Sequence, residues 1–352
     1  MAQIDKPNLH FNTKLYTGNG AVTTHTGVGF QPDWVWIKDR TQSHNHNLLD
    51  AVRGAPKIIM SDSSAAEITD STDGLTAFTS DGFTLGANTS GTQSYEINKN
   101  GNTYAAWCWK ANGQGSANND GSINTTYTSA NTTAGFSIVK YTGNGVSGAT
   151  VGHGLGAVPK MIIVKALNTV DNWAVYHARL GAEKYIELNL QAAEADSTEL
   201  WNDTEPTSSV FSIGNNSGVN TNGNPYIAYC FAEKKGFSRF SEYEGNNNTN
   251  GTFVYTGFKP AFLMVKPIDA SDNWVMFDNK RIVAINSSVS PHFFYANSTA
   301  SEINDSKQID FLSNGFKTRG SGNTTNRGST FVYWAFAENP IVGSNDVPAV
   351  AG

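Results

Sequence analysis

Two histidines in this sequence stand at a spacing that could bind a metal ion. His44 and His46 are two positions apart, so on a β-strand their side chains would point the same way. A structural metal site usually needs four ligands, and no third or fourth ligand stands near this pair. We therefore expect no metal site, and interpret both histidines as residues of a surface loop that could contact a partner.

A polar–aromatic triplet occurs twice, as Asp171-Asn172-Trp173 and Asp272-Asn273-Trp274. In a sugar-binding site, tryptophan offers a stacking face, and Asp and Asn hydrogen bond to hydroxyl groups. Alternatively, each triplet begins a strand, with its tryptophan in the core and its polar residues capping a turn. We favour the second interpretation because repeated landmarks usually encode the fold. Both triplets and the two histidines are kept as candidate binding residues.

The acidic residues show no pattern typical of catalysis. A polysaccharide hydrolase needs two carboxyl groups about 5–10 Å apart in contrasting environments. The acids are instead scattered through predicted loops: Asp62, Glu67, Asp70, Asp73, Glu96, Asp196, Glu199 and Asp203. The glycine-rich segment 151–156 leads into a proline and a strand, so it does not resemble a phosphate-binding loop before a helix. The sequence predicts no catalytic residue, no enzyme activity and no cofactor.

Three copies of one sequence pattern organise the chain. Each copy contains a segment that runs from a proline to a lysine six residues later, and it closes with an aromatic-rich segment. The proline–lysine segments are 32–38, 159–165 and 260–266, and the closing segments are 104–110, 226–232 and 331–337. The Asp-Asn-Trp triplet follows the lysine at the same distance in the second and third copies, whereas the first copy has Ser43–Asn47 there. We expect each lysine to end a buried strand at a solvated rim.

These patterns predict an all-β protein. The proline–lysine segments are apolar on both alternating faces, and the closing segments have one bulky and one small face. We therefore expect three tandem related antiparallel β-sandwich domains, jelly-roll-like in character. The predicted divisions are an N-terminal arm 1–10, repeats 11–111, 135–236 and 237–340, a linker 112–134 rich in Asn, Gly, Ser and Thr, and a C-terminal tail 341–352. Cys108 and Cys230 occupy equivalent positions and should be free thiols in separate cores.

The composition excludes several classes of partner. The chain has 352 residues, 24 Lys+Arg against 30 Asp+Glu, and a net charge of −6. Without a basic run, it is a poor candidate for binding nucleic acid. No segment approaches the roughly 18 apolar residues of a membrane span, so we expect no membrane insertion. The first ten residues do not resemble a signal peptide, and we expect the chain to fold in a cytosol.

The ordered motif series resembles a known family over nearly the whole chain. KLYTGNG, GVGFQPDWVWIK, GHGLGAVPKMIIVK, GNPYIAYCFAE, FVYTGFKPAFLMVK and FVYWAFAENP are similar to tail-fibre-like virion structural proteins of tailed phages, which are common among marine phages and those of cyanobacteria. The resemblance implies a virion protein assembled in the cytoplasm of the host bacterium.

That resemblance, together with the missing catalytic residues, leads to a functional expectation. We expect a non-enzymatic, tail-associated appendage that contacts the host surface, for host attachment or receptor binding. Because no heptad, collagen-like or β-helix shaft is present, the chain would be a tip or a similar appendage. The alternatives are a capsid decoration protein on the head and, third, a polysaccharide depolymerase. The expected partners are other tail or capsid proteins, a glycan or protein of the host cell surface, and further copies of the chain in a homo-oligomer.

Overall fold

The protein is an all-β chain built from antiparallel sheets, which confirms the all-β, antiparallel part of the prediction. The computed structural model describes residues 3–281, 292–304, 308–321 and 324–343. In those ranges the helices are single turns: η1 (Pro7–Leu9), α1 (Thr198–Trp201) and α2 (Ser217–Asn220). None of the described helices is long and apolar enough to cross a membrane.

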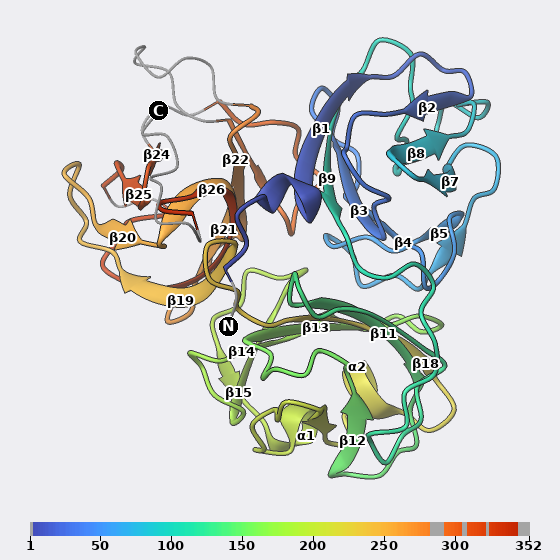
Figure 1. Ribbon diagram of the computed structural model, residues 1–352, viewed down its shortest axis with the longest axis vertical. Coiled ribbons are helices and arrows are strands. Elements are labelled where there is room, and N and C mark those ends of the chain that lie inside the picture. Colours follow the sequence, from blue (N-terminus) through green and yellow to red (C-terminus); the bar gives the residue numbers. More distant parts are fainter. Residues whose placement is uncertain (1–2, 282–291, 305–307, 322–323, 344–352) are drawn as a thin grey trace.

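Each sequence copy contributes one large sheet, and the three sheets share the order of four equivalent strands (Figure 1). The first sheet has the order β1 (Phe11–Thr17), β9 (Thr103–Trp109), β3 (Trp34–Asp39) and β4 (Asn47–Asp50). The second has the order β10 (Tyr127–Asn131), β11 (Phe136–Thr142), β18 (Pro225–Phe231), β13 (Met161–Ala166), β14 (Ala174–His177), β15 (Lys184–Glu187) and β16 (Ala195–Asp196). The third has the order β19 (Ser238–Glu244), β26 (Thr330–Pro340), β21 (Phe258–Pro267), β22 (Val275–Asp278) and β23 (Phe293–Tyr295). In all three, the closing strand lies between the first strand and the strand that carries the lysine.

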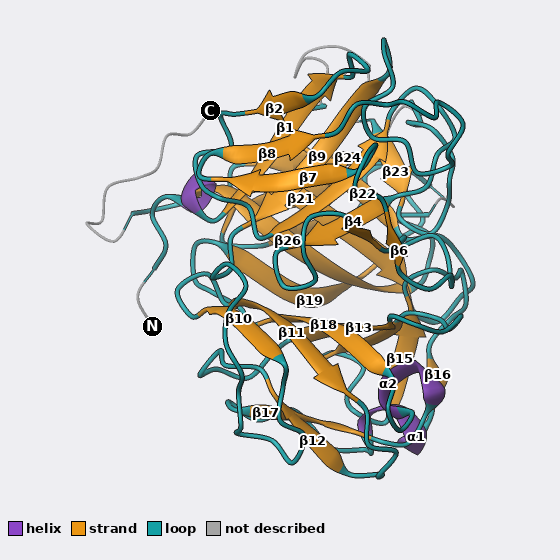
Figure 2. Cartoon of the chain, turned by 90° about the vertical axis from the view of Figure 1, so that its right-hand side faces the viewer, coloured by secondary structure: helices purple, strands orange, loops and turns teal. Residues whose placement is uncertain are grey.

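Smaller sheets lie against the outward faces of the large ones (Figure 2). They are β2 (Thr23–His25), β8 (Gly82–Leu85) and β7 (Leu75–Thr79) in the first copy, β12 (Ala149–Gly152) and β17 (Val210–Ile213) in the second, and β20 (Phe253–Tyr255), β25 (Gly315–Thr318) and β24 (Ile309–Leu312) in the third. A short pair, β5 (Lys57–Ile58) and β6 (Ile68–Thr69), belongs to the first copy. The small face of each closing strand joins the hydrophobic cluster beneath the smaller sheet of its own copy.

The bulky faces of the closing strands meet in one aromatic core shared by all three copies. Trp34 of the first copy stacks on Tyr229 of the second, with ring centroids 4.5 Å apart. Phe231 of the second copy contacts Trp334 of the third at 5.1 Å. Phe11 of the first copy stacks on a ring of the third copy, Phe336, at 5.3 Å. The largest hydrophobic cluster therefore belongs to no single copy, and the three large sheets surround it as the sides of a triangle (Figure 1).

The segment 112–134 packs against the second copy and does not run free between two copies, as a linker would. Its strand β10 pairs with β11 and extends the large sheet. Ile123 lies beside Val151 of β12 and is only 6% exposed. The polar composition of the segment pointed to a linker, but Ile123 is buried, and Thr128 and Ser129 of β10 are buried as well.

Cys108 and Cys230 are buried, free and in different clusters, as the sequence predicted. Burial raises the pKa of both thiols far above the ordinary value, which suppresses the reactive thiolate. We expect native protein to resist a thiol reagent such as 5,5′-dithiobis(2-nitrobenzoate) and to react at two thiols per chain after unfolding. Stoichiometric labelling of native protein at pH 8 would contradict this placement.

Candidate functional site

The lysine that ends each proline–lysine strand is buried at an interface between two copies. Lys165 Nζ donates to the carbonyl oxygen of Ala166 at 2.8 Å and to that of Ser64, in the first copy, at 3.3 Å. Burial lowers its pKa to about 8, although the nearby charge of Asp171 opposes this shift. The prediction of a solvated rim was wrong, because the neighbouring copy covers the end of the strand and leaves Lys165 0% exposed.

The other two lysines repeat this geometry. Lys38 Nζ donates to Asp39 O at 2.9 Å and Thr299 O at 3.2 Å, and Lys266 Nζ donates to Pro267 O at 2.7 Å and Gln191 O at 3.2 Å. Burial also lowers the pKa of both ammonium groups to about 8. The lysine of the second copy thus contacts the first copy, that of the third contacts the second, and that of the first contacts the third. The three contacts form a closed ring.

A backbone hydrogen bond accompanies each lysine across the same interface. The carbonyl two residues after the lysine accepts an N–H from a glutamate of the neighbouring copy. The three pairs are Leu167 with Glu67 at 2.8 Å, Ile268 with Glu194 at 2.7 Å, and Arg40 with Glu302 at 3.1 Å. Each of the three interfaces therefore contains the same main-chain hydrogen bond, at the same distance along the chain from its lysine.

The triplet tryptophans cross these interfaces as well. Trp173 Nε1 donates to the carbonyl oxygens of Met60 at 3.0 Å and Ser63 at 3.1 Å in the first copy. Trp274 Nε1 donates to Glu187 O of the second copy at 2.9 Å. Trp173 is 0% exposed and Trp274 3% exposed, which agrees with core positions. A stacking role for either ring in sugar binding does not fit the structure, because neither face is open.

The polar residues of the triplets hold their own turns. Asn189 Oδ1 accepts the N–H of Trp173 at 2.9 Å, and Asn189 Nδ2 donates to Asn172 Oδ1 at 2.8 Å. The third copy has the same arrangement among Asn297, Trp274 and Asn273, at 2.9 Å for both bonds. Asp171 and Asp272 accept the N–H of the next residue at 2.8 and 2.7 Å. These side chains shape the chain where β14 and β22 begin.

His46 replaces the triplet tryptophan in the first copy. Its Nδ1 accepts from Trp36 Nε1 at 2.8 Å, so its Nε2 carries the proton and donates to Tyr295 O of the third copy at 3.1 Å. Burial, helped by the charge of Lys38, holds the pKa of His46 well below its usual value. His46 is 0% exposed, so its prediction as a surface-loop residue was wrong. Both ring nitrogens are used, which leaves none for a metal ion.

His44 is partly buried and has a different partner. Its Nδ1 lies 3.0 Å from Asp39 Oδ2, a carboxylate that also accepts from Asn102 Nδ2 at 2.7 Å. His44 therefore contacts a residue of its own copy, whereas His46 contacts the third copy. Among the described residues, no group of three or more His, Cys, Asp or Glu side chains could hold a metal ion.

Sequence reasoning missed two buried Asp–Arg pairs. Arg53 Nε lies 2.5 Å from Asp50 Oδ2, and Tyr229 of the second copy donates its hydroxyl to the same oxygen at 2.7 Å. In the third copy, Arg281 Nε lies 2.6 Å from Asp278 Oδ2, which also accepts from Trp107 Nε1 of the first copy at 3.0 Å. All four charged side chains are 0% exposed. Their signal was available, because each Asp follows its lysine at the same distance and each Arg follows three residues later.

The second copy replaces this charged pair by neutral residues. His177 stands at the aspartate position, opposite Met161 of β13, and Leu180 stands at the arginine position. His177 Nε2 lies 3.4 Å from Tyr333 O of the third copy, and burial lowers its pKa to about 4. The ring of interfaces therefore contains two ionic variants and one neutral variant of the same contact.

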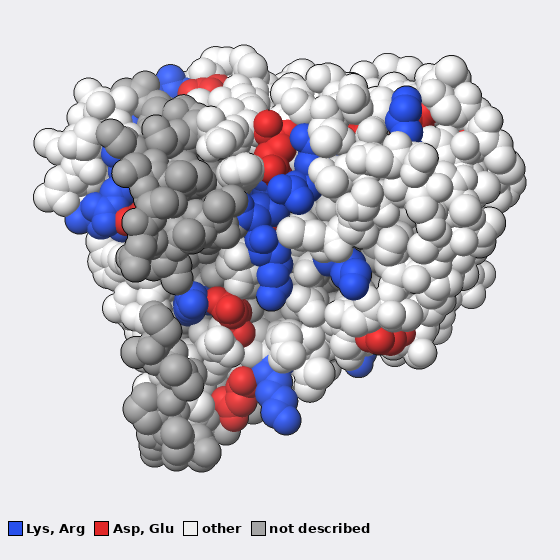
Figure 3. All heavy atoms as spheres, turned by 90° about the horizontal axis from the view of Figure 1, so that it is seen from above, with Lys and Arg blue, Asp and Glu red and all other residues white. Residues whose placement is uncertain are grey.

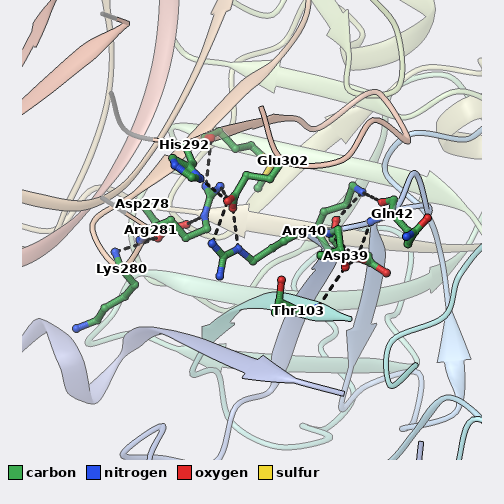
Figure 4. Close-up of polar contacts among 12 residues, drawn as sticks. Asp39, Arg40, Gln42, Thr103, Asp278, Lys280, Arg281, His292 and Glu302 are labelled. Carbon is green, nitrogen blue, oxygen red and sulfur yellow. Dashed lines mark hydrogen bonds and ion pairs between the residues drawn. The ribbon is translucent and has the colours of Figure 1, made fainter. Parts of the chain in front are cut away.

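An ionic cluster joins the first and third copies (Figure 4). Arg40 makes a two-pronged contact with Glu302, at 2.8 and 2.9 Å, and Arg281 lies 3.1 Å from the same carboxylate. His292 also points to Glu302. Burial opposes ionisation of Glu302, but the hydrogen bond from Arg40 and the charge of Arg281 outweigh it and lower the pKa to about 2. The cluster has no free carboxylate for acid–base chemistry, and it connects the first copy of the chain to the last.

A small polar pocket lies beside the second triplet position. Its volume is about 50 Å³, and its lining includes Asp171, Asn172, Tyr185, Glu187 and Asn216. Burial and the nearby Asp171 raise the pKa of Glu187. A pocket of this size holds a few water molecules rather than a sugar ring. Asp171 and Asn172, two of the predicted binding residues, thus line a pocket that is too small for the predicted ligand.

The outer surface carries few charges. Figure 3 shows charged side chains of both signs in small mixed groups on one face of the molecule. The net charge of −6 is consistent with that distribution.

One acidic residue provides a direct test of the interface description. Asp62 occupies the position of Asn189 and Asn297, and accepts from the N–H of His46 at 3.1 Å and from Asn45 Nδ2 at 3.1 Å. Burial raises its pKa from 3.8 to about 6. Because the folded form holds this proton more tightly than the unfolded form, the stability from this group falls as the pH rises from about 4 to about 6.

We expect Asp62→Asn to raise the free energy of unfolding at pH 7 by about 1–2 kcal/mol. The gain is smaller than the full pKa shift implies, since Lys38 loses a nearby countercharge. At pH 4 the gain should vanish. Denaturant unfolding at both pH values measures it, with Asn189→Asp as the matched control that should destabilise at pH 7. A loss of stability in Asp62→Asn at pH 7 would refute the assignment.

A family model described as domain of unknown function (DUF7483) matches residues 6–340, so the chain belongs to that family. No curated protein and no solved structure matches the chain. The family description assigns no activity.

Proposed function

We propose that this chain is a non-enzymatic structural protein of a tailed-phage particle, in which three tandem related β-sandwich units act as one rigid, tail-associated appendage that contacts the host surface. The observation that carries the proposal is the closed ring of interfaces. The side chains best suited to chemistry are hydrogen bonded to neighbouring copies there: His46, Asp50 and Arg53 are buried, and the Glu302 side chain is only 9% exposed.

The proposed appendage is a scaffold whose loops do the contacting. A shared aromatic core and buried ionic contacts fix the three copies relative to one another, which gives exposed loops a defined spacing. Loops on such a body suit repeated, weak contacts with a glycan or protein of the host envelope. Other virion proteins would hold the appendage on the tail, after assembly in the host bacterial cytoplasm.

Immunogold electron microscopy of intact virions tests the proposal. Antibody raised against the recombinant chain should place gold on the tail or its fibres. Gold over the head would instead identify a capsid decoration protein, and the absence of specific gold from particles that contain the chain by mass spectrometry would indicate an internal position. Either result would overturn the proposed role.

The enzyme alternative has its own readout. Purified chain incubated with envelope polysaccharide of the host should release no reducing ends above the level of heat-denatured chain. Sustained release that follows the folded protein would contradict the non-enzymatic proposal, whatever the position of the gold.

A further inference from the structure

Strand β20 carries two exposed aromatic side chains that its equivalents lack. Phe253 is 45% exposed and Tyr255 is 58% exposed, while Val254 between them is 6% exposed and packs inward. Val254 pairs with Phe316, as Val151 pairs with Phe211 in the second copy. By this register, Phe253 occupies the position of Thr150 in the second copy and Thr24 in the first. Tyr255 occupies the position of Gly152 in the second copy and Thr26 in the first.

The backbone of these two residues faces an open sheet edge. Thr252 O accepts from Thr318 N at 3.0 Å, and Thr256 N donates to Asn314 O at 3.0 Å. Hydrogen-bonded pairs alternate along an antiparallel ladder, so the N–H and C=O groups of Phe253 and Tyr255 point away from β25. β20 is the terminal strand of its sheet, and no described residue pairs with its outer edge.

In the second copy, the equivalent edge is occupied by the chain itself. Ile123 forms a parallel bridge with Val151, and its N–H donates to Thr150 O at 3.0 Å. The Ile123 side chain is 6% exposed and joins the hydrophobic cluster of the second copy. Ser122 N donates to Thr150 Oγ1 at 2.9 Å, so a small polar residue flanks the isoleucine. This contact shows what kind of ligand this edge accepts.

We propose that the outer edge of β20 binds an extended polypeptide segment of a partner protein, added parallel to β20, with an apolar side chain beside Val254 and small polar residues on either side. By analogy with Thr150 and Ile123, Phe253 O would accept the N–H of the apolar residue. The N–H of Tyr255 would donate to the carbonyl of that residue, and the two aromatic rings would cover the added strand. Open strand edges of this kind bind peptides through main-chain hydrogen bonds.

The proposal goes beyond host contact, because it describes an assembly surface. It does not depend on the position of the protein in a particle, so failure of the labelling experiment leaves it standing. It also differs from sugar binding, in which the same rings would act by stacking alone.

A peptide with the sequence of residues 118–126, acetylated and amidated at its ends, is a defined probe. Added to the ¹⁵N-labelled full chain, it should shift the amide resonances of residues 253–255 and 315–317 and slow hydrogen exchange at the Tyr255 amide. Absence of shifts at β20 with peptide in millimolar excess would overturn the proposal.

Two variants separate main-chain pairing from ring stacking. Tyr255→Pro removes an N–H that β25 does not use, and should weaken peptide binding about tenfold or more, the effect of one lost hydrogen bond with its partner left unpaired. Phe253→Thr installs the residue found in the other copies, and should weaken binding less. The proposal fails if Phe253→Thr abolishes binding while Tyr255→Pro leaves it intact. If Tyr255→Pro does not fold, slowed exchange of the Tyr255 amide in the wild type decides, and unchanged exchange in the bound state rules out strand addition.

Discussion

A fragment that contains only the second copy and the segment that packs on it, residues 112–236, is expected not to form a stable folded monomer. Its sheet would expose the side chains that now pack in the shared core, including Phe136, Trp173, Tyr229 and Phe231. Leaving a large apolar side chain in water costs about 1.5–3 kcal/mol. Four such side chains together cost about 6–12 kcal/mol, which is comparable with the roughly 5–15 kcal/mol by which a whole domain is stable.

Near-ultraviolet circular dichroism and size-exclusion chromatography of the fragment measure this outcome. We expect weak tertiary signal, and either aggregation or self-association through the exposed aromatic face. The chain 3–343 is the matched control, and it should be folded and cooperative. A monomeric fragment with a sharp thermal transition would show that each copy holds its own core.

Replacement of Arg53 by leucine is expected to lower the free energy of unfolding by about 3–5 kcal/mol, the usual effect of removing one partner of a buried ion pair. The Arg53 side chain is 0% exposed and contacts Asp50, Glu67 and the carbonyl of Leu48. Without the guanidinium, Asp50 would keep two hydrogen bonds, from the Tyr229 hydroxyl and from the backbone N–H of residue 53, and no countercharge. Chemical denaturation at pH 7 measures the loss.

Two variants show whether the loss of stability comes from the charge of Asp50, which is left buried without a partner of opposite charge. Arg179→Leu removes a partner from the exposed Arg179–Glu242 pair, where the guanidinium side chain is 49% exposed, and should cost no more than about 1 kcal/mol. Asp50→His combined with Arg53→Leu reproduces His177 and Leu180 of the second copy, and should be more stable than Arg53→Leu alone. A double variant less stable than the single variant would contradict this explanation.

The strands were predictable because their signals are local. Apolar residues on both faces of 34–37 and 161–164 indicated central strands, and the structure has β3 and β13 there. The bulky face of the closing segments indicated a core, and Trp107 and Trp109 are fully buried. The alternation of apolar and polar residues along one strand indicates which side chains are buried. It does not indicate which part of the chain packs against them.

The interfaces between copies could not be predicted for that reason. Lysine at the end of a strand ordinarily reaches water, and only the arrival of Ser64 beside Lys165 makes burial possible. His46 looked like a loop residue because its acceptor, Tyr295, is far away in the sequence. The equal spacing between the proline and the lysine in each copy revealed the repeat. In the structure, each of these lysines also lies against a neighbouring copy.

The central claim is that the three copies fold as one body around a shared core, and scanning calorimetry of the full chain tests it most directly. The account predicts a single transition, with the calorimetric enthalpy equal to the van't Hoff enthalpy. Two or three resolved transitions, or a calorimetric enthalpy two to three times the van't Hoff value, would mean that the copies melt independently and would contradict it.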